Sequence, residues 1–467
     1  MPTPRPISRL AAAIALTACS GGGGSTDSGS AATTADASST SSTGTTTSDG
    51  TTGTSAGTTT GGDAGLTYYR DIKAIVDARC AGCHRPGDIA PFSLTTYAEV
   101  AAMAPYMVED LESRTMPPWP PAAACRTYEH DRSLGDGELA ARLAWIDLGA
   151  PEGDPKDAPP APDPLPPLGF DVDLAAAEPY TPTVVPDEYR CFLYDWPKDQ
   201  VTYATGFTIE PGDRAIVHHV IAFIIPPGAA ATYEALDAAD PAPGYPCFGS
   251  PGGDNSFDVE WLGAWVPGIG DQGAFPEGTG IEIRPGSKIA VQLHYHPFDG
   301  SGSDLSHVKV RTAPAVDHPA YLLPLANPAW IYGFQPMTIP AGAADVVHAF
   351  DMDVGNIISF IRPDSTFGIG EPVVAHAASA HMHTLGKSAT LSIVRGGGGD
   401  TECLLDIPRW DFNWQGLYPF TATTVIDPAD KVRIECHFDN SKGQETVAWG
   451  EGTGDEMCLG LFYVSKP

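Results

Sequence analysis

Basic residues are scarce in this sequence. Its 467 residues include 26 lysines and arginines against 58 aspartates and glutamates, which gives a formal net charge of −32. This charge repels nucleic acid and anionic lipid surfaces. We therefore expect no nucleic-acid partner and no membrane contact through basic side chains. The length allows several hydrophobic cores.

Long hydrophobic runs are lacking as well, and the N-terminal run is short for a spanning helix. Residues 1–19 place two arginines before this run and small residues after it, which is typical of an export signal. Residues 16–19, LTAC, resemble the bacterial lipobox, whose cysteine is lipidated when the signal is removed. We expect an exported protein anchored by lipid at Cys19, in the outer membrane because Ser20 follows. An uncleaved anchor or a plain secretory signal is the alternative.

Two segments have the composition of linkers. Residues 20–65 are almost wholly Gly, Ser, Thr, Ala and Asp, too poor in apolar area to offset chain entropy, so we expect a disordered tether. Residues 150–169 are rich in proline and acid and predict a stiff, extended spacer. Two folded blocks remain, residues 66–149 and 170–467.

The first block carries a haem-attachment motif. It reads CAGCH, with Cys80, Cys83 and His84 after a stretch of helical apolar spacing. Two cysteines three positions apart can form thioethers with both haem vinyl groups, and the next histidine can then ligate the iron. A zinc site or a local disulfide is the alternative, but no second CxxC motif accompanies this one. Residues 66–149 also resemble a class I cytochrome c, which implies a small all-α domain.

The sixth iron ligand would be a methionine after the motif. Met103 and Met107 lie four residues apart in a segment that reads as a helix, where methionine more often fills a core. Met116 lies in SRTMPPWPP, a proline-restricted loop in which no helix packing competes for the thioether. We therefore favour Met116 and keep the other two as alternatives.

Helix signals are few in the second block. Short apolar-alternating segments such as RAIVHHVIAFII, KIAVQLHYHP and KVRIECHF are separated by Gly, Pro and Asp turns, which predicts strands throughout. Regular short strands over about 300 residues predict two stacked β-sandwiches, jelly-roll-like in architecture.

Histidines at metal-ligand spacing lie on these predicted strands. His381 and His383 flank one methionine, Met382, in SAHMHTLGKS. Alternate residues of a strand face the same way, so both imidazoles can bind one metal ion while the methionine points to the other face. His294 and His296 in QLHYHP have the same spacing.

A further pair, His218 and His219, is adjacent in the chain. On a regular strand two adjacent side chains face opposite ways. We therefore expect the pair to bind one ion only at an irregularity of the strand, or at a cleft whose two rims are both used.

Five motifs in order resemble the copper type II, ascorbate-dependent monooxygenases, the family of peptidylglycine and dopamine β-monooxygenases. They are VHHVIAF, AWVPG…FPEGTGIEI, VQLHYHP, HMHTLGKS and DEMCLGLFYV, over most of residues 185–465. The resemblance implies two copper β-sandwiches, at residues 170–322 and 323–467, each holding one copper ion beside an open gap. It also implies dioxygen as co-substrate and ascorbate as the usual reductant, which a fused haem would make dispensable.

The resemblance also implies the copper ligands. The first ion would take three histidines and the second two histidines and a methionine, a set suited to Cu(I) because a thioether is a soft ligand. His296 is left as a neighbour of the first site. The implied ligands are His218, His219 and His294 for the first copper and His381, His383 and Met457 for the second.

Nine cysteines are present, and three are assigned to lipid and haem. The other six suit an oxidising compartment. The resemblance implies a disulfide between Cys436 and Cys458, which would stiffen the position of Met457. The pairing of the remaining four stays open: Cys125, Cys191, Cys247 and Cys403.

Two departures from the family limit the substrate. Peptidylglycine enzymes bind the substrate carboxylate with an arginine before the HxH pair and with Asn and Tyr after the Met-Cys pair. Here Ser379, Leu459 and Leu461 stand at those positions. Nothing there would pair the charge of a peptide carboxylate, so we expect a neutral or apolar small molecule.

Together these patterns predict a copper-dependent monooxygenase that hydroxylates a C–H bond with dioxygen. Two copper ions would act with one covalently attached haem c, which passes electrons from an external donor. The alternative is a non-catalytic haem and copper lipoprotein that transfers electrons or only binds copper.

Overall fold

The computed structural model describes a subset of the chain. It covers residues 65–86, 90–160, 168–185, 187–247, 250–252, 259–265, 273–297, 302–361, 367–396, 400–412, 414–450, 452 and 454–467. The predicted signal peptide, Cys19 and nearly all of the first linker lie outside these residues. Within them, every helix falls short of the length and apolarity that crossing a bilayer requires.

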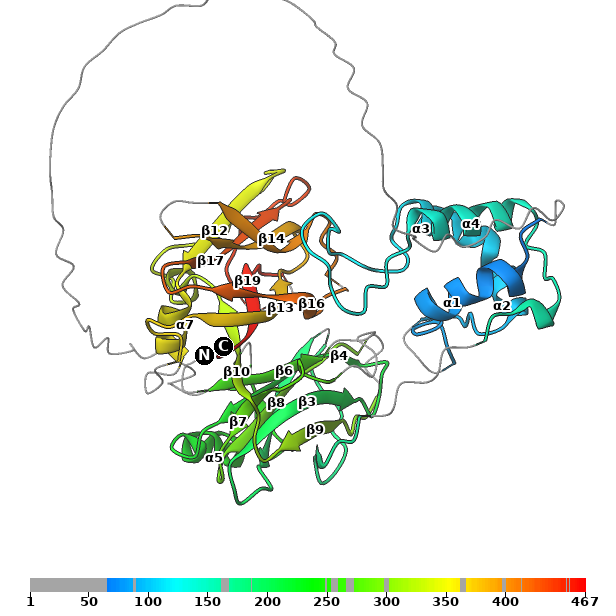
Figure 1. Cartoon of the computed structure of the whole chain (residues 1–467). Helices are drawn as coiled ribbons and strands as arrows, with labels where there is room; N and C mark the ends of the chain where they lie inside the picture. Colours follow the sequence, from blue (N-terminus) through cyan, green and yellow to red (C-terminus); the bar gives the residue numbers. More distant parts are fainter. Residues whose placement is uncertain are drawn as a thin grey trace, which may run out of the picture. The chain divides into compact units, whose positions relative to one another are not determined.

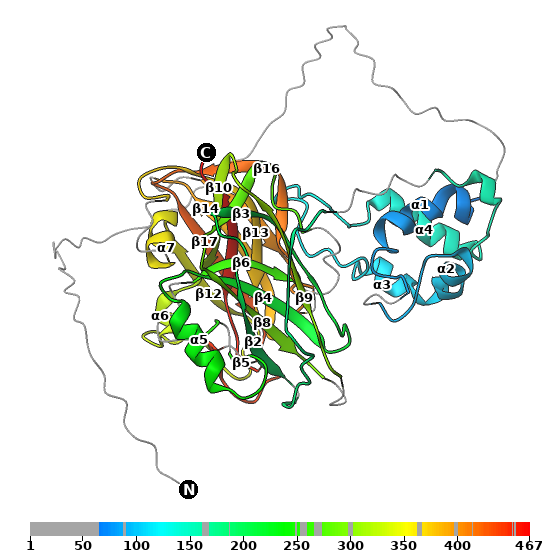
Figure 2. The ribbon, with the colours of Figure 1, turned by 90° about the horizontal axis from the view of Figure 1, so that it is seen from below.

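Short helices gather in the block before residue 160 (Figure 2). Helix α2 (Tyr97–Met103) begins after Thr96, whose hydroxyl accepts the N–H of Glu99 at 3.3 Å in a capping box. Tyr68, Ile72 and Trp145 are among the residues buried between the helices. The elements are η1 (Tyr68–Ile72), α1 (Lys73–Arg79), α2 (Tyr97–Met103), η2 (Ala104–Tyr106), α3 (Val108–Glu112), α4 (Asp136–Asp147) and η3 (Pro155–Asp157).

Strands dominate the chain after residue 170, which confirms the prediction of an all-β architecture there. In the first half, ten strands are joined in the order β1-β9-β3-β7-β10-β6-β4-β8-β2-β5 within the described residues. Their bounds, with one helix, are β1 (Val172–Ala175), β2 (Glu188–Asp195), β3 (Thr202–Glu210), β4 (Val217–Ile225), α5 (Ala230–Ala239), β5 (Tyr245–Pro246), β6 (Glu260–Trp265), β7 (Thr279–Ile283), β8 (Lys288–Tyr295), β9 (His307–Ala313) and β10 (His318–Leu325).

The second half forms a sandwich of two layers (Figure 1). One layer has the order β12-β17-β14-β15, and β13 pairs with β16 and β19 in the other. A short pair, β11 and β18, is separate. The bounds are α6 (Pro328–Ile331), β11 (Thr338–Ile339), β12 (Val346–Met352), α7 (Val354–Ile361), β13 (Val373–His381), β14 (Gly386–Val394), β15 (Thr401–Ile407), β16 (Tyr418–Ile426), β17 (Lys431–Phe438), β18 (Val447–Ala448) and β19 (Leu459–Ser465).

Strand β10 connects the two halves. Its residues 318–320 pair with β7, Leu322 pairs with Trp261 of β6, and residues 320–325 pair antiparallel with β19. The boundary that the sequence places between residues 322 and 323 therefore falls inside this strand. The hydrogen-bonded sheet continues from one sandwich into the other.

Each sandwich has its own apolar core. Leu293, Tyr295 and Ile281 are buried in the first, and Met382, Ile434 and Phe462 are buried in the second. Met382, the residue directly after β13, therefore packs into the core of the second sandwich.

Among the described residues, three disulfides link strands and loops. The structure contains Cys436–Cys458, the pair that the resemblance implies. It also pairs the four cysteines that the sequence left open, as Cys191–Cys247 and Cys125–Cys403. The last of these crosses from the first block to β15, over 278 residues of sequence.

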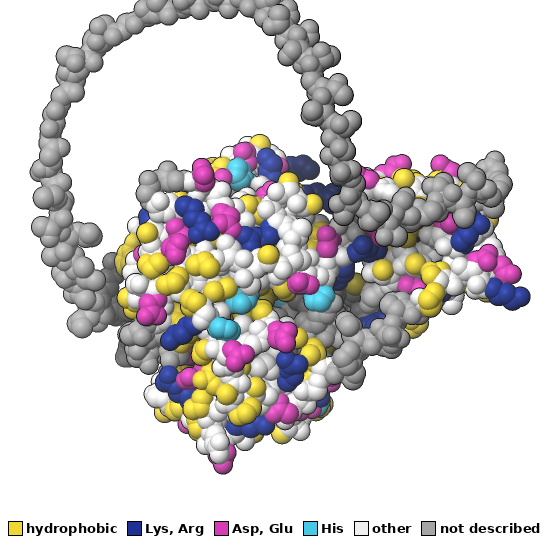
Figure 3. All heavy atoms as spheres, viewed as in Figure 1, with side chains coloured by type: hydrophobic (Ala, Val, Ile, Leu, Met, Phe, Trp, Pro, Cys, Tyr) yellow, Lys and Arg dark blue, Asp and Glu magenta, His cyan; other side chains and the backbone are white. Residues whose placement is uncertain are grey.

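Charged side chains are interspersed on the surface. On the face drawn in Figure 3, acidic side chains lie among basic and hydrophobic ones. Pairs such as Lys288 with Asp195 and Lys431 with Asp351 contribute to this mixture.

Candidate metal centres and cavity

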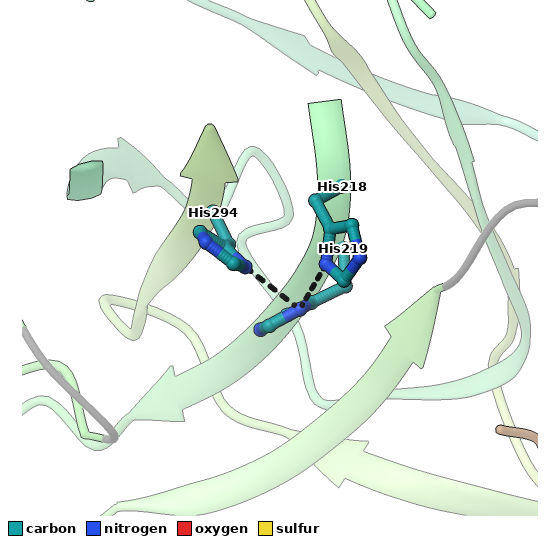
Figure 4. A group of neighbouring side chains, drawn as sticks. All are labelled: His218, His219 and His294. Carbon is teal, nitrogen blue, oxygen red and sulfur yellow. Dashed lines mark hydrogen bonds between the residues drawn. The ribbon is translucent and has the colours of Figure 1, made fainter. Parts of the chain in front are cut away.

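Three histidines from two strands converge in the first sandwich. His218 and His219 begin β4 and His294 lies near the end of β8, opposite His219 (Figure 4). One ring nitrogen of each lies within 4.8 Å of the others. The register of β4 shifts between Val217 and His219, and this bulge supplies the irregularity that two adjacent ligands require.

The ring nitrogens stand at the spacing of metal ligands. Nδ1 of His219 lies 3.3 Å from Nδ1 of His218 and 3.1 Å from Nδ1 of His294. Imidazole nitrogens held at about 2.0 Å from one ion in a tetrahedral arrangement lie about 3.3 Å from each other. The three histidines therefore fit a metal ion bound through their Nδ1 atoms.

Asp187 orients the third histidine. Its Oδ1 accepts hydrogen bonds from Nε2 of His294 and from Nδ1 of His296, both at 2.8 Å. Burial by itself raises the pKa of this carboxyl, but the two histidines lower it below its ordinary value. A carboxylate on the far nitrogen fixes the ring and its tautomer, so Nδ1 of His294 is left for a metal ion.

Burial keeps these imidazoles neutral. It lowers the pKa of His294 to about 4, with a contribution from neighbouring His218, and lowers the pKa of His219 well below its ordinary range. The ring of Tyr189 stacks on His294 with centroids 4.2 Å apart and planes 7° apart. A neutral, positioned imidazole is the form that binds a metal ion.

A second pair of histidines lies at the end of β13. His381 is the last residue of the strand and His383 follows in the turn, so only the first is on a regular strand. Their rings nevertheless lie 5.0 Å apart. Nδ1 of His381 donates to Oε1 of Gln415 at 2.6 Å, and Nδ1 of His383 donates to the carbonyl of Asp455 at 3.0 Å. Both Nε2 atoms are left for a metal ion.

Met457 lies in the segment before β19 and is 9 % exposed. The next residue, Cys458, is bonded to Cys436 of β17. On its other side, the buried carboxylate of Glu456 accepts the backbone N–H of His383 at 2.9 Å. Burial raises the pKa of Glu456 to about 7. The methionine is thus fixed on both sides, next to the turn that carries His383.

One aromatic ring touches both histidine groups. Phe412, in the loop between β15 and β16, stacks on His218 with centroids 5.7 Å apart. The same ring meets His383 edge-on at 6.0 Å. The two candidate metal centres are therefore separated by a single side chain at this point.

A cavity of about 410 Å³ connects the two groups. His219 of the first group and His381, His383 and Met457 of the second all line it. Among the described residues that line it, none is Asp, Glu, Lys or Arg. Its walls are mostly apolar: Phe207, Phe223, Trp261, Leu262, Trp265, Phe275, Leu322 and Leu325.

The three positions that depart from the peptide-binding pattern face this cavity. Ser379, Leu459 and Leu461 all line it. A charged substrate group placed there would lose its hydration without gaining an ionic partner.

The CxxCH motif lies at the end of α1 and in the turn after it. Nδ1 of His84 donates to the carbonyl of Phe92 at 3.0 Å, which leaves Nε2 for an iron ligand. Arg142 is fully buried and donates to Sγ of Cys80 at 2.9 Å, while its Nε has no hydrogen-bond partner among the described residues. A buried cation with an orphaned N–H suits an anionic group such as a haem propionate.

The three candidate methionines differ in their surroundings. Met103 and Met107 pack against the helical core, and Sδ of Met107 lies 3.7 Å from Nη2 of Arg142. Met116 is half-buried in the segment after α3, outside that core. Met116 therefore stays a prediction for the sixth ligand, with Met103 and Met107 as the alternatives.

Several residues of these centres carry no sequence signal. Asp187 stands in an ordinary PDEYR segment, and Phe412 and Gln415 belong to an aromatic loop, RWDFNWQG. The spacing of Phe412 and Gln415 along the chain does not point to a metal site, because the histidines that they contact are distant in sequence. No local spacing links Asp187 to His294, which lies 107 residues further along the chain.

Solved structures offer only distant likenesses. A structure of infectious bursal disease virus, Gx strain, is 13% identical, with 66% of this chain and 75% of that chain covered and a TM-score of 0.18. A tandem CBM22 domain of Xyn10C from Paenibacillus barcinonensis is 8% identical, with 58% and 79% covered and a TM-score of 0.15. Such scores do not indicate a shared fold.

A family model gives a direct match to the region that holds the second centre. It spans residues 366–465, which include His381, His383 and Met457. The matched family is described as copper type II ascorbate-dependent monooxygenase, C-terminal domain, and the match supports a place in that family for this part of the chain.

Proposed function

We propose that this protein is a copper-dependent monooxygenase that hydroxylates a C–H bond of a small neutral or apolar molecule. The observation that carries the proposal is one uncharged cavity lined by His219, His381, His383 and Met457. Copper bound at the two centres would supply one-electron redox chemistry and dioxygen activation, as it does in the matched family.

The donor sets support two different ions. Three Nδ1 atoms suit copper in either oxidation state, whereas two imidazoles with a thioether favour Cu(I). The first set is His218, His219 and His294, and the second is His381, His383 and Met457. The far ring nitrogens donate hydrogen bonds to oxygens of Asp187, Gln415 and Asp455, so the rings are oriented before a metal binds.

The cavity supports the substrate class. Its apolar walls favour burial of a hydrocarbon surface, and Ser379 and Gln415 are among its few polar groups. A neutral hydroxyl, amide or aromatic compound fits this lining, and a peptide carboxylate does not.

The electron supply is part of the same proposal. Hydroxylation by dioxygen consumes two electrons, and a haem c held by Cys80, Cys83 and His84 would deliver them one at a time from an external donor. A haem on the same chain is present at a high effective concentration. Two observations support this cofactor. The carbonyl of Phe92 accepts the Nδ1–H of His84, and the Nε–H of buried Arg142 has no partner among the described residues.

The location completes the proposal. Export with a lipid on Cys19, and retention at the outer membrane, follow from the N-terminal signal alone. The three disulfides suit such an oxidising compartment.

Metal analysis and oxygen uptake test the proposal. We expect two coppers and one haem per chain, and oxygen uptake with neutral or benzylic compounds but not with peptides. Uptake must yield one hydroxylated product per dioxygen. Copper binding without any product across the panel would instead favour a copper-binding or electron-transfer lipoprotein.

A further inference from the structure

A segment between the haem motif and the second sandwich is fastened to that sandwich. We define the connecting segment as residues 113–132. Cys125 is bonded to Cys403 of β15, and the N–H of Ala122 donates to the carbonyl of Asp406 at 2.8 Å. The guanidinium of Arg126 pairs with Glu402 at 2.5 Å.

The fastening continues at both ends of the segment. The side chain of Arg409 donates to the carbonyls of Ser113 and Arg114 at 3.0 and 2.8 Å. Tyr128 forms an isolated β-bridge with Phe420 of β16. A disulfide, an ion pair and backbone hydrogen bonds therefore hold one side of the segment against β15, β16 and the loop between them.

Two aromatic rings meet where the segment touches β16. Trp119 lies edge-on to Tyr418, with centroids 5.5 Å apart and planes 86° apart. Trp119 follows Met116, the favoured iron ligand, by three residues. Tyr418 is buried, and it also packs against Tyr128 at 5.9 Å.

The contact continues to the second candidate metal centre. The ring of Tyr418 lies over Gly416, where a Cβ atom would be 3.6 Å from the ring carbon Cζ. Gly416 adjoins Gln415, whose Oε1 accepts the Nδ1–H of His381 at 2.6 Å. Short steps thus lead from Trp119 to a ligand of the second copper.

We propose that electrons from the haem enter the two-copper system at the His381, His383 and Met457 centre, and that they pass through Trp119, Tyr418 and Gln415. This inference rests on the proposed function, which supplies the haem and the copper ions. In each step ferrous haem loses one electron to become ferric, and Cu(II) at this centre gains it to become Cu(I). The other centre, on β4 and β8, would then exchange electrons with this one across Phe412.

Proteins with a single copper centre test the point of electron input. His218→Ala with His219→Ala keeps only the second centre, and His381→Ala with His383→Ala keeps only the first. Each full-length protein is loaded with Cu(II) without oxygen, its haem is reduced by a light-triggered donor, and haem absorbance is followed. Copper content by metal analysis confirms the loading.

We expect rapid haem oxidation only in the protein that keeps the second centre. Haem oxidation only in the protein that keeps the first centre, or at equal rates in both proteins, overturns the inference. Either result would still agree with electron transfer from haem to copper, as the proposed function states. If neither protein nor the unaltered one oxidises its haem, the relay in the proposed function fails as well.

A variant of the segment tests the route itself. Trp119→Leu should slow haem oxidation severalfold in the protein with only the second centre, whereas Trp119→Phe, which keeps a ring, should slow it less. Tyr106→Leu is the matched control, since this aromatic of the first block is 76 % exposed and lies outside the segment. The rates are compared in the protein with only the second centre and in its Trp119→Leu, Trp119→Phe and Tyr106→Leu variants. Equal rates of haem oxidation, with copper content and circular dichroism unchanged, would show that the route does not pass through Trp119.

Discussion

The phenyl ring of Phe412 stacks on the imidazole of His218, with ring planes 23° apart. Because the same ring also touches His383, it sets how close the two candidate centres lie to each other. We expect Phe412→Ala to retain both coppers and to lower turnover by about tenfold or more, since small displacements of reacting groups are costly. Product formation and metal content would be measured together. A variant with unaltered turnover would mean that the ring only fills space.

The carboxylate of Asp187 should set the affinity of the first centre. Asp187→Ala removes the acceptor of His294, and we expect copper affinity there to fall by about 10- to 100-fold. Calorimetric titration would measure it. Asp173→Ala is the matched control, because Asp173 accepts a similar hydrogen bond at 2.8 Å from His307 on the surface. Equal copper affinities in the two variants would show that Asp187 does not contribute to copper binding at the first centre.

Two methionines near the HxH turn should respond differently to substitution. Met457→Ile should leave the first copper bound, weaken Cu(I) binding at the second and abolish hydroxylation. Met382 stands between the two histidines in the sequence, and its side chain is in the core. Met382→Leu should keep activity and cost less than about 1.5 kcal/mol of stability. Cu(I) titration and product analysis distinguish the two. Retained hydroxylation in the Met457 variant would exclude it as an essential ligand.

The Cys125–Cys403 disulfide should stabilise the connecting segment. Replacing both cysteines by serine should lower the free energy of unfolding by about 2 to 5 kcal/mol and speed proteolysis within residues 113–132. Replacing Cys191 and Cys247 is the control, and it should lower stability without exposing that segment. Denaturant unfolding and mapping of the cleavage sites would check this. Cleavage elsewhere in the Cys125 variant would contradict it.

A buried carboxylate should make stability depend on acid pH. Burial alone raises the pKa of Asp430, but the N–H groups of Gly396 and Asp427 and the guanidinium of Arg395 lower it below its ordinary value. The folded pKa is below the unfolded one, so this contribution is present above about pH 3.9 and is lost as pH falls through the folded pKa.

Asp430→Asn tests this dependence. The variant should lose about 1 to 3 kcal/mol at neutral pH and should show a shallower further loss below about pH 4. Urea unfolding at several pH values measures both effects. A variant whose acid profile runs parallel to that of the unaltered protein would contradict the assignment.

Local patterns predicted those parts of the centres that depend on neighbouring residues. His381 lies beside His383 and Met382 packs into the core, as the HxH spacing predicts, although β13 ends at His381 and the other two residues follow the strand. Strand alternation also predicted that His218 and His219 need an irregularity, and a bulge is present there. These features depend on a few consecutive residues, so the sequence contains them.

Features that depend on distant segments were beyond such patterns. Cys125 and Cys403 are 278 residues apart, and the four cysteines that the sequence left open allow three pairings that spacing alone cannot rank. Asp187 meets His294 across 107 residues and Gln415 meets His381 across 34. Their side chains are common surface types, and only the folded sheets bring them to the metal ligands.

The shared strand β10 restricts how the two sandwiches can move apart. Its backbone is hydrogen bonded to β19 over residues 320–325 and to β7 over residues 318–320. A hinge that parted the two sandwiches would break this ladder and leave buried peptide groups unpaired, at a cost of about 1 to 3 kcal/mol for each group. Any opening of the cavity to a substrate would therefore leave this ladder intact, and the two sandwiches would move as one body.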